Sequence, residues 1–160
     1  MQSTTSSAAQ VAALMLISLV AGSLFGIWRG YEAIQYTPST FLEVHQGAVR
    51  GLNTLLPAMA IASLVLVLLL AFLNRARPGP LWLYLLTAVA IAAGGVITRF
   101  INQPINEQVM SWTATTLPAD WTSLRDTWWN WHRMRLVTTV AAELLLIAAI
   151  FQDRNSSPAR

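Results

Sequence analysis

The sequence contains no cysteine and no lysine, and it is poor in charge. The absence of cysteine excludes disulfides, thiolate metal sites and dithiol redox relays. Only 11% of the 160 residues are charged, whereas an ordinary soluble domain carries about 25%. Together with an apolar content of 55%, this deficit indicates a membrane protein. The ten basic residues are all arginines spread along the chain, without a clustered basic face, so nucleic acid is not expected as a partner.

Other functional signatures are missing as well. The chain has no Ser-His-Asp arrangement, no glycine-rich phosphate loop and no carboxylate pair suited to acid–base chemistry. The polar N-terminus MQSTTSSAAQ lacks the basic residues that open a secretory signal peptide. The first apolar run is therefore predicted to be a retained membrane span.

Four apolar segments are long enough to cross a bilayer, because a helix needs about 20 apolar residues to span roughly 30 Å of hydrocarbon. We predict an all-α fold, a four-transmembrane-helix bundle that forms a single domain over residues 1–160. Its spans are expected at about 8–28, 52–73, 81–100 and 133–151.

The distribution of charge predicts the orientation. The short connection NRARPGP carries two arginines and no acid, and basic short loops stay in the cytoplasm. Both termini are then cytoplasmic, and the connections 29–51 and 101–132 lie on the outer side of the cell membrane. The fourth helix is expected to extend beyond the bilayer on that outer side.

Most of the polar chemistry lies between Arg99 and Arg135. Arg99, Asn102 and Asn106 are spaced three and four residues apart, so they share one helical face. Pro104 lacks a backbone N–H and predicts a kink between them. Carbonyl groups freed at membrane depth are tolerated where the backbone lines a cavity or is buried in protein.

The fourth helix presents a second polar face. At 100° per residue, one stripe contains Arg125, Trp129, His132, Thr139 and Glu143, flanked by Trp128 and Arg135. The tryptophans are either interfacial anchors or the wall of a binding pocket. An intramembrane carboxylate such as Glu143 costs about 2.5–3.5 kcal/mol, so we expect it to be paired, protonated or functional.

The two histidines leave several interpretations open. His45 and Gln46 precede the second span, on a helix end that is either solvated or lines a cavity shared with the Trp-rich stretch. His45 and His132 are candidate axial ligands of a haem within a four-helix bundle. A zinc or copper site is disfavoured, since Glu43 and Glu107 show no recognisable ligand spacing. Alternatively, His132 is a general base, because an unperturbed pKa near 6.5 suits proton transfer at neutral pH.

A family resemblance follows from the motif that ends at Arg135. The pattern N-x-P-x-N at 102–106, followed by W…P-x-D-W…L-R-D-x-W-W-x-W-H-x-x-R, resembles the DUF1772, or anthrone oxygenase-like, family of small membrane proteins. The resemblance implies a four-helix transmembrane bundle. For some members it also implies oxidation of anthrones to anthraquinones by O₂ without a metal or flavin.

Such a cofactor-free site needs a base, groups that stabilise an oxyanion, and a flat aromatic slot. The resemblance suggests these catalytic residues: His132 as the base, Arg125 and Arg135 for charge, and Asn102 and Asn106 to orient the oxygen. The expected substrate-binding residues are Trp128 and Trp129, which would stack on the substrate, with His45, Gln46, Arg99 and Glu143.

The leading hypothesis is a cofactor-independent oxygenase that acts on a hydrophobic aromatic, anthrone-like or quinone-like molecule. One alternative is a non-enzymatic membrane module that binds a lipid, a quinone or a partner protein, and a third is a haem protein that uses His45 and His132. The expected partners are membrane lipid and a hydrophobic small molecule, and a homo-oligomer is left open.

Overall fold

The computed structural model describes residues 4–31 and 33–155, and these ranges contain helices, turns and loops but no strand. The elements are α1 (Thr4–Gly30), α2 (Pro38–Leu52), α3 (Leu55–Leu73), α4 (Pro78–Ile97), the π-helical turn η1 (Thr98–Asn102), α5 (Gln103–Ser111) and α6 (Trp121–Asn155). The all-α prediction is confirmed.

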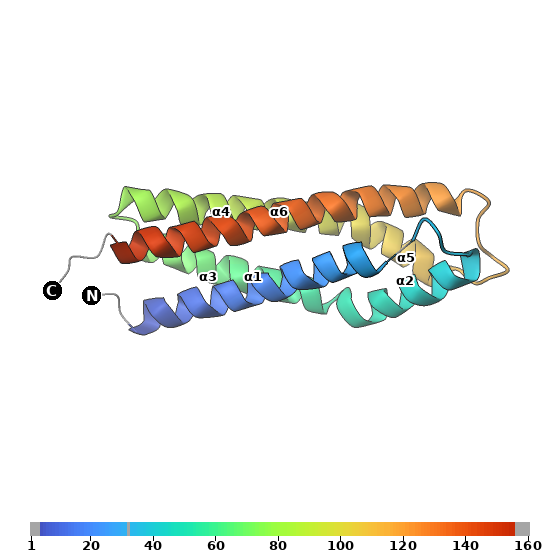
Figure 1. The fold of residues 1–160 in the computed structure, drawn as a ribbon, viewed down its shortest axis with the longest axis horizontal. Helices are drawn as coiled ribbons and strands as arrows, with labels where there is room; N and C mark the ends of the chain where they lie inside the picture. Colours follow the sequence, from blue (N-terminus) through green and yellow to red (C-terminus); the bar gives the residue numbers. More distant parts are fainter. Residues whose placement is uncertain (1–3, 32, 156–160) are drawn as a thin grey trace.

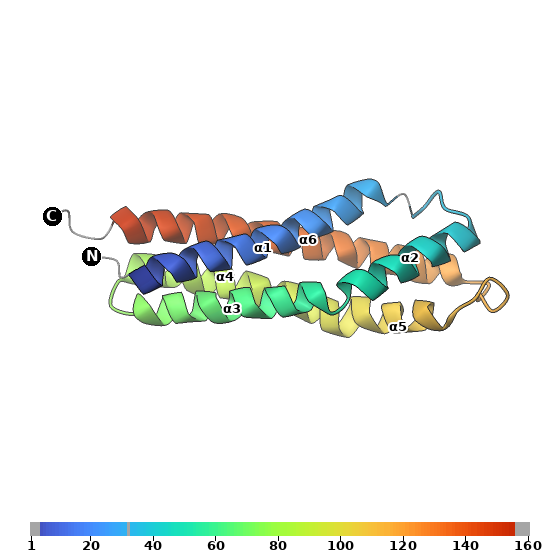
Figure 2. The ribbon, with the colours of Figure 1, turned by 90° about the horizontal axis from the view of Figure 1, so that it is seen from below.

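Four helical segments run along an elongated bundle (Figure 1). They are α1, α2 with α3, α4 with η1 and α5, and α6, and each is long and apolar enough to cross a membrane. The start of α1, the α3–α4 loop and the end of α6 share one end of the bundle, here called the terminal end (Figures 1 and 2). Helices α2 and α5 lie at the opposite, distal end. At 1.5 Å per residue, the 35 residues of α6 extend about 52 Å, well beyond the hydrocarbon thickness of about 30 Å.

A short break separates α2 from α3 at Asn53 and Thr54. In a continuous helix the Asn53 carbonyl would accept from the N–H of residue 57, which is a proline and has none. The break leaves the Asn53 side chain directed at α5, where its Oδ1 accepts from Asn106 Nδ2 at 2.8 Å.

The break predicted near Pro104 takes the form of a π-helical turn. The Gln103 N–H bonds to the carbonyl of Thr98, five residues back, so η1 is wider than the α-helix before it. Pro104 then lies in the first turn of α5, where a missing N–H costs little. Both Asn102 and Asn106 are buried as a result.

Side chains from all four segments form the main apolar core. Its fully buried members include Ala13 and Ile17 of α1, Val67 and Leu70 of α3, Tyr84 of α4, and Ala142, Leu146 and Ala149 of α6. Small residues on α1 and α6 let these helices approach closely. Large apolar side chains such as Ile61, Val89 and Leu144 point outward on the same segments and are more than half exposed. This pattern is that of a bundle surrounded by lipid.

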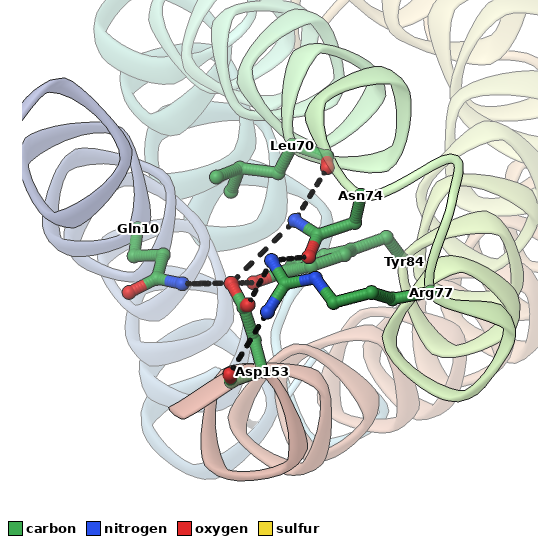
Figure 3. A network of polar contacts seen from close by, with 6 residues as sticks. All are labelled: Gln10, Leu70, Asn74, Arg77, Tyr84 and Asp153. Atoms are coloured by element: carbon green, nitrogen blue, oxygen red, sulfur yellow. Dashed lines mark hydrogen bonds and ion pairs between the residues drawn. The ribbon is translucent and has the colours of Figure 1, made fainter. Parts of the chain in front are cut away.

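A buried polar network closes the terminal end (Figure 3). Asp153 of α6 is fully buried and forms an ion pair of 2.6 Å with Arg77 of the α3–α4 loop. Its Oδ2 accepts from Gln10 Nε2 of α1 at 2.7 Å and from the Tyr84 hydroxyl of α4 at 3.3 Å. Asn74, at the end of α3, donates to the same oxygen at 3.5 Å. One carboxylate thereby ties all four segments together.

Candidate functional site

Two adjoining cavities lie inside the bundle, the larger near its middle and the smaller toward its distal end. The larger, called the apolar cavity, has a volume of about 370 Å³ and is lined mainly by α1, α3 and α4. The smaller, called the polar cavity, has about 40 Å³, and its lining includes His45, Asn106 and Trp128. Thr98 and Arg135 line both cavities, so the polar cavity forms the distal extension of the apolar one.

The apolar cavity opens between α3 and α4. Its inner wall includes Leu24, Leu56 and Ile91, which are buried, whereas Ile61 of α3 and Gly95 of α4 are exposed at its rim. A Cβ atom added at Gly95 would meet nothing within 4 Å, so the rim is open there. In a membrane this opening faces the lipid.

Asn106 of α5 is the centre of the polar cluster. Its Oδ1 accepts from the indole Nε1 of Trp128 at 2.8 Å, and its Nδ2 donates to Asn53 Oδ1 at 2.8 Å. Since an indole N–H can only donate, the orientation of the amide is determined. His45 Nε2 lies 3.1 Å from the same Oδ1. Asn106 thus joins α2, α5 and α6.

His132 and Arg135 form a second pair within the cluster. His132 is fully buried, and its Nε2 lies 3.1 Å from the carbonyl of Leu24 on α1. Its Nδ1 lies 3.0 Å from Arg135 Nη2. Arg135 Nη1 also donates to Thr98 Oγ1 at 3.4 Å, and its Nε is buried with no partner among the residues that the structure describes. No carboxylate in the described ranges lies within ion-pair distance of this guanidinium.

Aromatic rings pack around this pair. The Trp128 indole stacks on His132 with centroids 5.0 Å apart and meets His45 edge-on at 4.8 Å. Trp128 is 6% exposed and lies on the buried face of α6, whereas Trp129, expected on the stripe itself, is only half-buried. Trp129 stacks on His132 at 5.7 Å and on Tyr31 at 6.5 Å.

Tyr31 is a site residue that the sequence analysis missed. It follows α1 in a short loop, and its ring contacts His45 and Trp128. Its hydroxyl is buried and has no hydrogen-bond partner within residues 4–31 and 33–155. Burial, followed by the proximity of Tyr36, raises the pKa of Tyr31, so the phenol stays neutral at physiological pH. No spacing in the sequence connects this residue with α2 or α6.

Several expected site residues make other contacts and line neither cavity. Asn102 Nδ2 donates to the Trp128 carbonyl at 3.2 Å. Gln46 Nε2 donates to the backbone carbonyl of Val109 at 2.9 Å and so holds α2 against α5. Glu143 accepts from Ser18 Oγ of α1 at 2.5 Å, which makes it a hydrogen-bonded carboxyl group between two spans.

The two remaining arginines of the expected site lie apart from each other. Arg99 lines the exposed rim of the apolar cavity. Arg125 lies toward the distal end, where it forms an ion pair of 2.8 Å with Asp126 and lies over the ring of Trp121. Its Nη1 donates to the carbonyl of Ala33 at 3.4 Å. Arg125 therefore holds the loop after α1 against α6. Of the three arginines expected in the site, Arg135 is the one that lines both cavities.

The histidines are poorly placed for a shared haem. The Trp128 indole is in contact with both imidazoles, and both Nε2 atoms already face protein oxygens. A porphyrin bound by both histidines would have to displace that indole. The described residues also contain no group of three or more His, Asp or Glu side chains that would hold a metal ion.

Fold and site together define a four-helix membrane protein with a lipid-facing cavity that ends at a histidine–arginine cluster. A family model described as anthrone oxygenase matches residues 46–145, well over half of the chain, and the protein belongs to that family. The matched segment includes Asn106, Trp128, His132 and Arg135 and begins one residue after His45. Neither the curated proteins nor the solved structures contain a significant match to the chain.

Proposed function

We propose that this protein is a membrane oxygenase that oxidises a hydrophobic, anthrone-like phenolic substrate with O₂. The observation that carries this proposal is Arg135, whose guanidinium has no carboxylate partner in the described part of the chain and lies at the end of an apolar cavity. A charge removed from water is costly unless it is paired. An anionic oxygen on a bound ligand would supply the missing partner.

The apolar cavity suits a flat aromatic molecule. Its volume of about 370 Å³ falls within the range of about 300–1,000 Å³ found for small-molecule sites. Its opening between α3 and α4 lets a substrate dissolved in the bilayer enter sideways. Its apolar walls hold the rings, while Thr98 and Arg135 lie where the polar edge of the substrate would rest.

The chemistry needs a proton acceptor and stabilisation of negative charge. A neutral imidazole of the cluster removes a proton from the ring CH₂ of an anthrone, and the electron pair stays on the substrate as an enolate. Arg135 stabilises the enolate oxygen, as preorganised donors do at developing oxyanions. The polar cavity, about 40 Å³, has room for O₂ beside it.

The reaction balances with O₂ as the only oxidant. The enolate carbon forms a bond to O₂, and the resulting peroxide anion takes a proton to give a hydroperoxide. Loss of the second ring C–H proton, with cleavage of the O–O bond, releases water and leaves a carbonyl group. One CH₂ and one O₂ become one C=O and one H₂O.

A binding module is the second candidate, because the lining of the apolar cavity is mostly apolar and would also hold a lipid chain or a quinone. Turnover distinguishes the two. Purified protein in lipid nanodiscs is given an anthrone, and O₂ uptake and quinone formation are followed together. An oxygenase consumes one O₂ per quinone above the spontaneous rate, whereas a module binds the anthrone without accelerating its oxidation.

Two glycine variants test whether this cavity is the site. Gly95→Phe places a ring at the open rim of the apolar cavity and should lower kcat/KM by about tenfold or more, equivalent to about 1.4 kcal/mol. Gly22→Phe is the matched control, because Gly22 also has open space around it but lies exposed on α1 outside both cavities. Equal activity of the two variants would place the site elsewhere.

A further inference from the structure

We infer that His45 of α2, rather than His132 of the Trp-rich helix, is the proton acceptor of the site. This inference rests on the oxygenase function proposed above and assigns the base within it. It follows from the hydrogen-bond partners of the four imidazole nitrogens.

The partners of His45 determine which nitrogen carries its hydrogen. Asn106 Oδ1 is the acceptor for the Trp128 indole N–H, so His45 Nε2, 3.1 Å from that oxygen, must also donate. In the neutral ring, the lone pair is then on Nδ1. That atom is buried and has no hydrogen-bond partner among the described residues. His45 therefore holds an unused base inside the bundle.

Both nitrogens of His132 are already engaged. Nε2 faces the carbonyl oxygen of Leu24, which can only accept, so Nε2 carries the hydrogen. Nδ1 faces Arg135 Nη2 at 3.0 Å, and a guanidinium can only donate, so Nδ1 uses its lone pair on Arg135. A proton added to Nδ1 would break this bond and place two cations in contact. His132 is thus a positioning residue for Arg135.

The positions of the two histidines relative to the cavities support the same assignment. His45 lines the polar cavity, where Arg135 joins it to the apolar cavity, whereas His132 lines neither. A substrate held by Arg135 therefore has His45 on its distal side. A proton passes from the substrate C–H to His45 Nδ1, while Nε2–H remains bonded to Asn106.

The same imidazolium closes the cycle. After O₂ adds to the enolate, the proton on His45 Nδ1 neutralises the peroxide anion. His45 returns to its neutral form with the hydrogen on Nε2, as Asn106 requires. No proton leaves the site in these two steps.

A pair of alanine variants tests the assignment, with the full chain in nanodiscs and an anthrone as substrate. His45→Ala should lower kcat by about 10²- to 10⁴-fold, the contribution typical of a general base, and added imidazole should restore part of the rate. His132→Ala should lose rate because Arg135 is no longer oriented, and imidazole should not restore it. A merely structural role for His45 would not give imidazole rescue.

The outcomes separate this inference from the proposed function. Absence of turnover by the wild-type protein refutes the oxygenase proposal and the base with it. Wild-type turnover with an unchanged kcat in His45→Ala, or imidazole rescue in His132→Ala instead, refutes only the assignment of His45. If His45→Ala does not fold or is not rescued, ¹⁵N-histidine NMR of the wild-type protein decides. An acidic hydroxyanthraquinone should convert His45, and not His132, to the doubly protonated ring, and any other result overturns the inference.

Discussion

Asn106→Ala should destabilise this protein much more than Asn102→Ala, although both delete the same atoms at buried positions of the third segment. Removing the Asn106 amide leaves two buried donors without an acceptor, the Trp128 indole N–H and His45 Nε2–H. It also leaves Asn53 Oδ1 without a donor, but Asn53 is only half-buried and gains water. At about 1–3 kcal/mol for each unsatisfied buried group, the two stranded donors make the expected loss about 2–6 kcal/mol.

Within the described ranges the Asn102 side chain makes one hydrogen bond, to the Trp128 carbonyl at 3.2 Å, so its loss should be about 1 kcal/mol. The cavity contributions of the two substitutions are similar and largely cancel in the comparison. Unfolding in mixed micelles with increasing SDS, followed by tryptophan fluorescence and by helical circular dichroism, measures both. A loss at Asn106 no larger than that at Asn102 would refute the three-helix hydrogen-bond network.

Two further predictions concern charges. Asp153→Ala removes the carboxylate that pairs with Arg77 and accepts from the amides of Gln10 and Asn74, so the free energy of unfolding should fall by about 3–5 kcal/mol. Glu107→Ala, at an exposed position, should change it by less than about 0.5 kcal/mol in the same SDS titration. Arg135→Lys removes the planar guanidinium that contacts His132 and Thr98, so kcat/KM with an anthrone should fall by about 10²- to 10³-fold. Arg133→Lys, at an exposed position, is the control and should keep wild-type turnover.

Length and apolarity alone were sufficient to predict the four helices. Each predicted span lies within one of the long helical segments, because a run of about 20 apolar residues has few alternatives to a membrane helix. Helical spacing also predicts which side chains of one helix lie next to each other. His132 and Arg135, three residues apart on α6, are in contact, as their spacing predicts.

Helical periodicity does not predict which residues of different segments are in contact. The π turn changes the helical phase between Thr98 and Asn102, and no rule of 100° per residue anticipates it. Asn53 reaches Asn106 because the second segment breaks where Pro57 lacks an N–H. Asp153 holds the terminal end together through partners from three other segments. The choice between His45 and His132 likewise depends on which oxygen faces each nitrogen, and this is a property of the packed bundle.

The most direct test of the proposed oxygenase is a single-turnover reaction of the protein in nanodiscs with an anthrone under ¹⁸O₂. Mass spectrometry of the extracted quinone measures where the oxygen goes. The account predicts one ¹⁸O atom in the new carbonyl group and the other in water, with a rate that Gly95→Phe lowers and Gly22→Phe leaves unchanged. Quinone formation no faster than in protein-free nanodiscs, or a new carbonyl group without ¹⁸O, would contradict it.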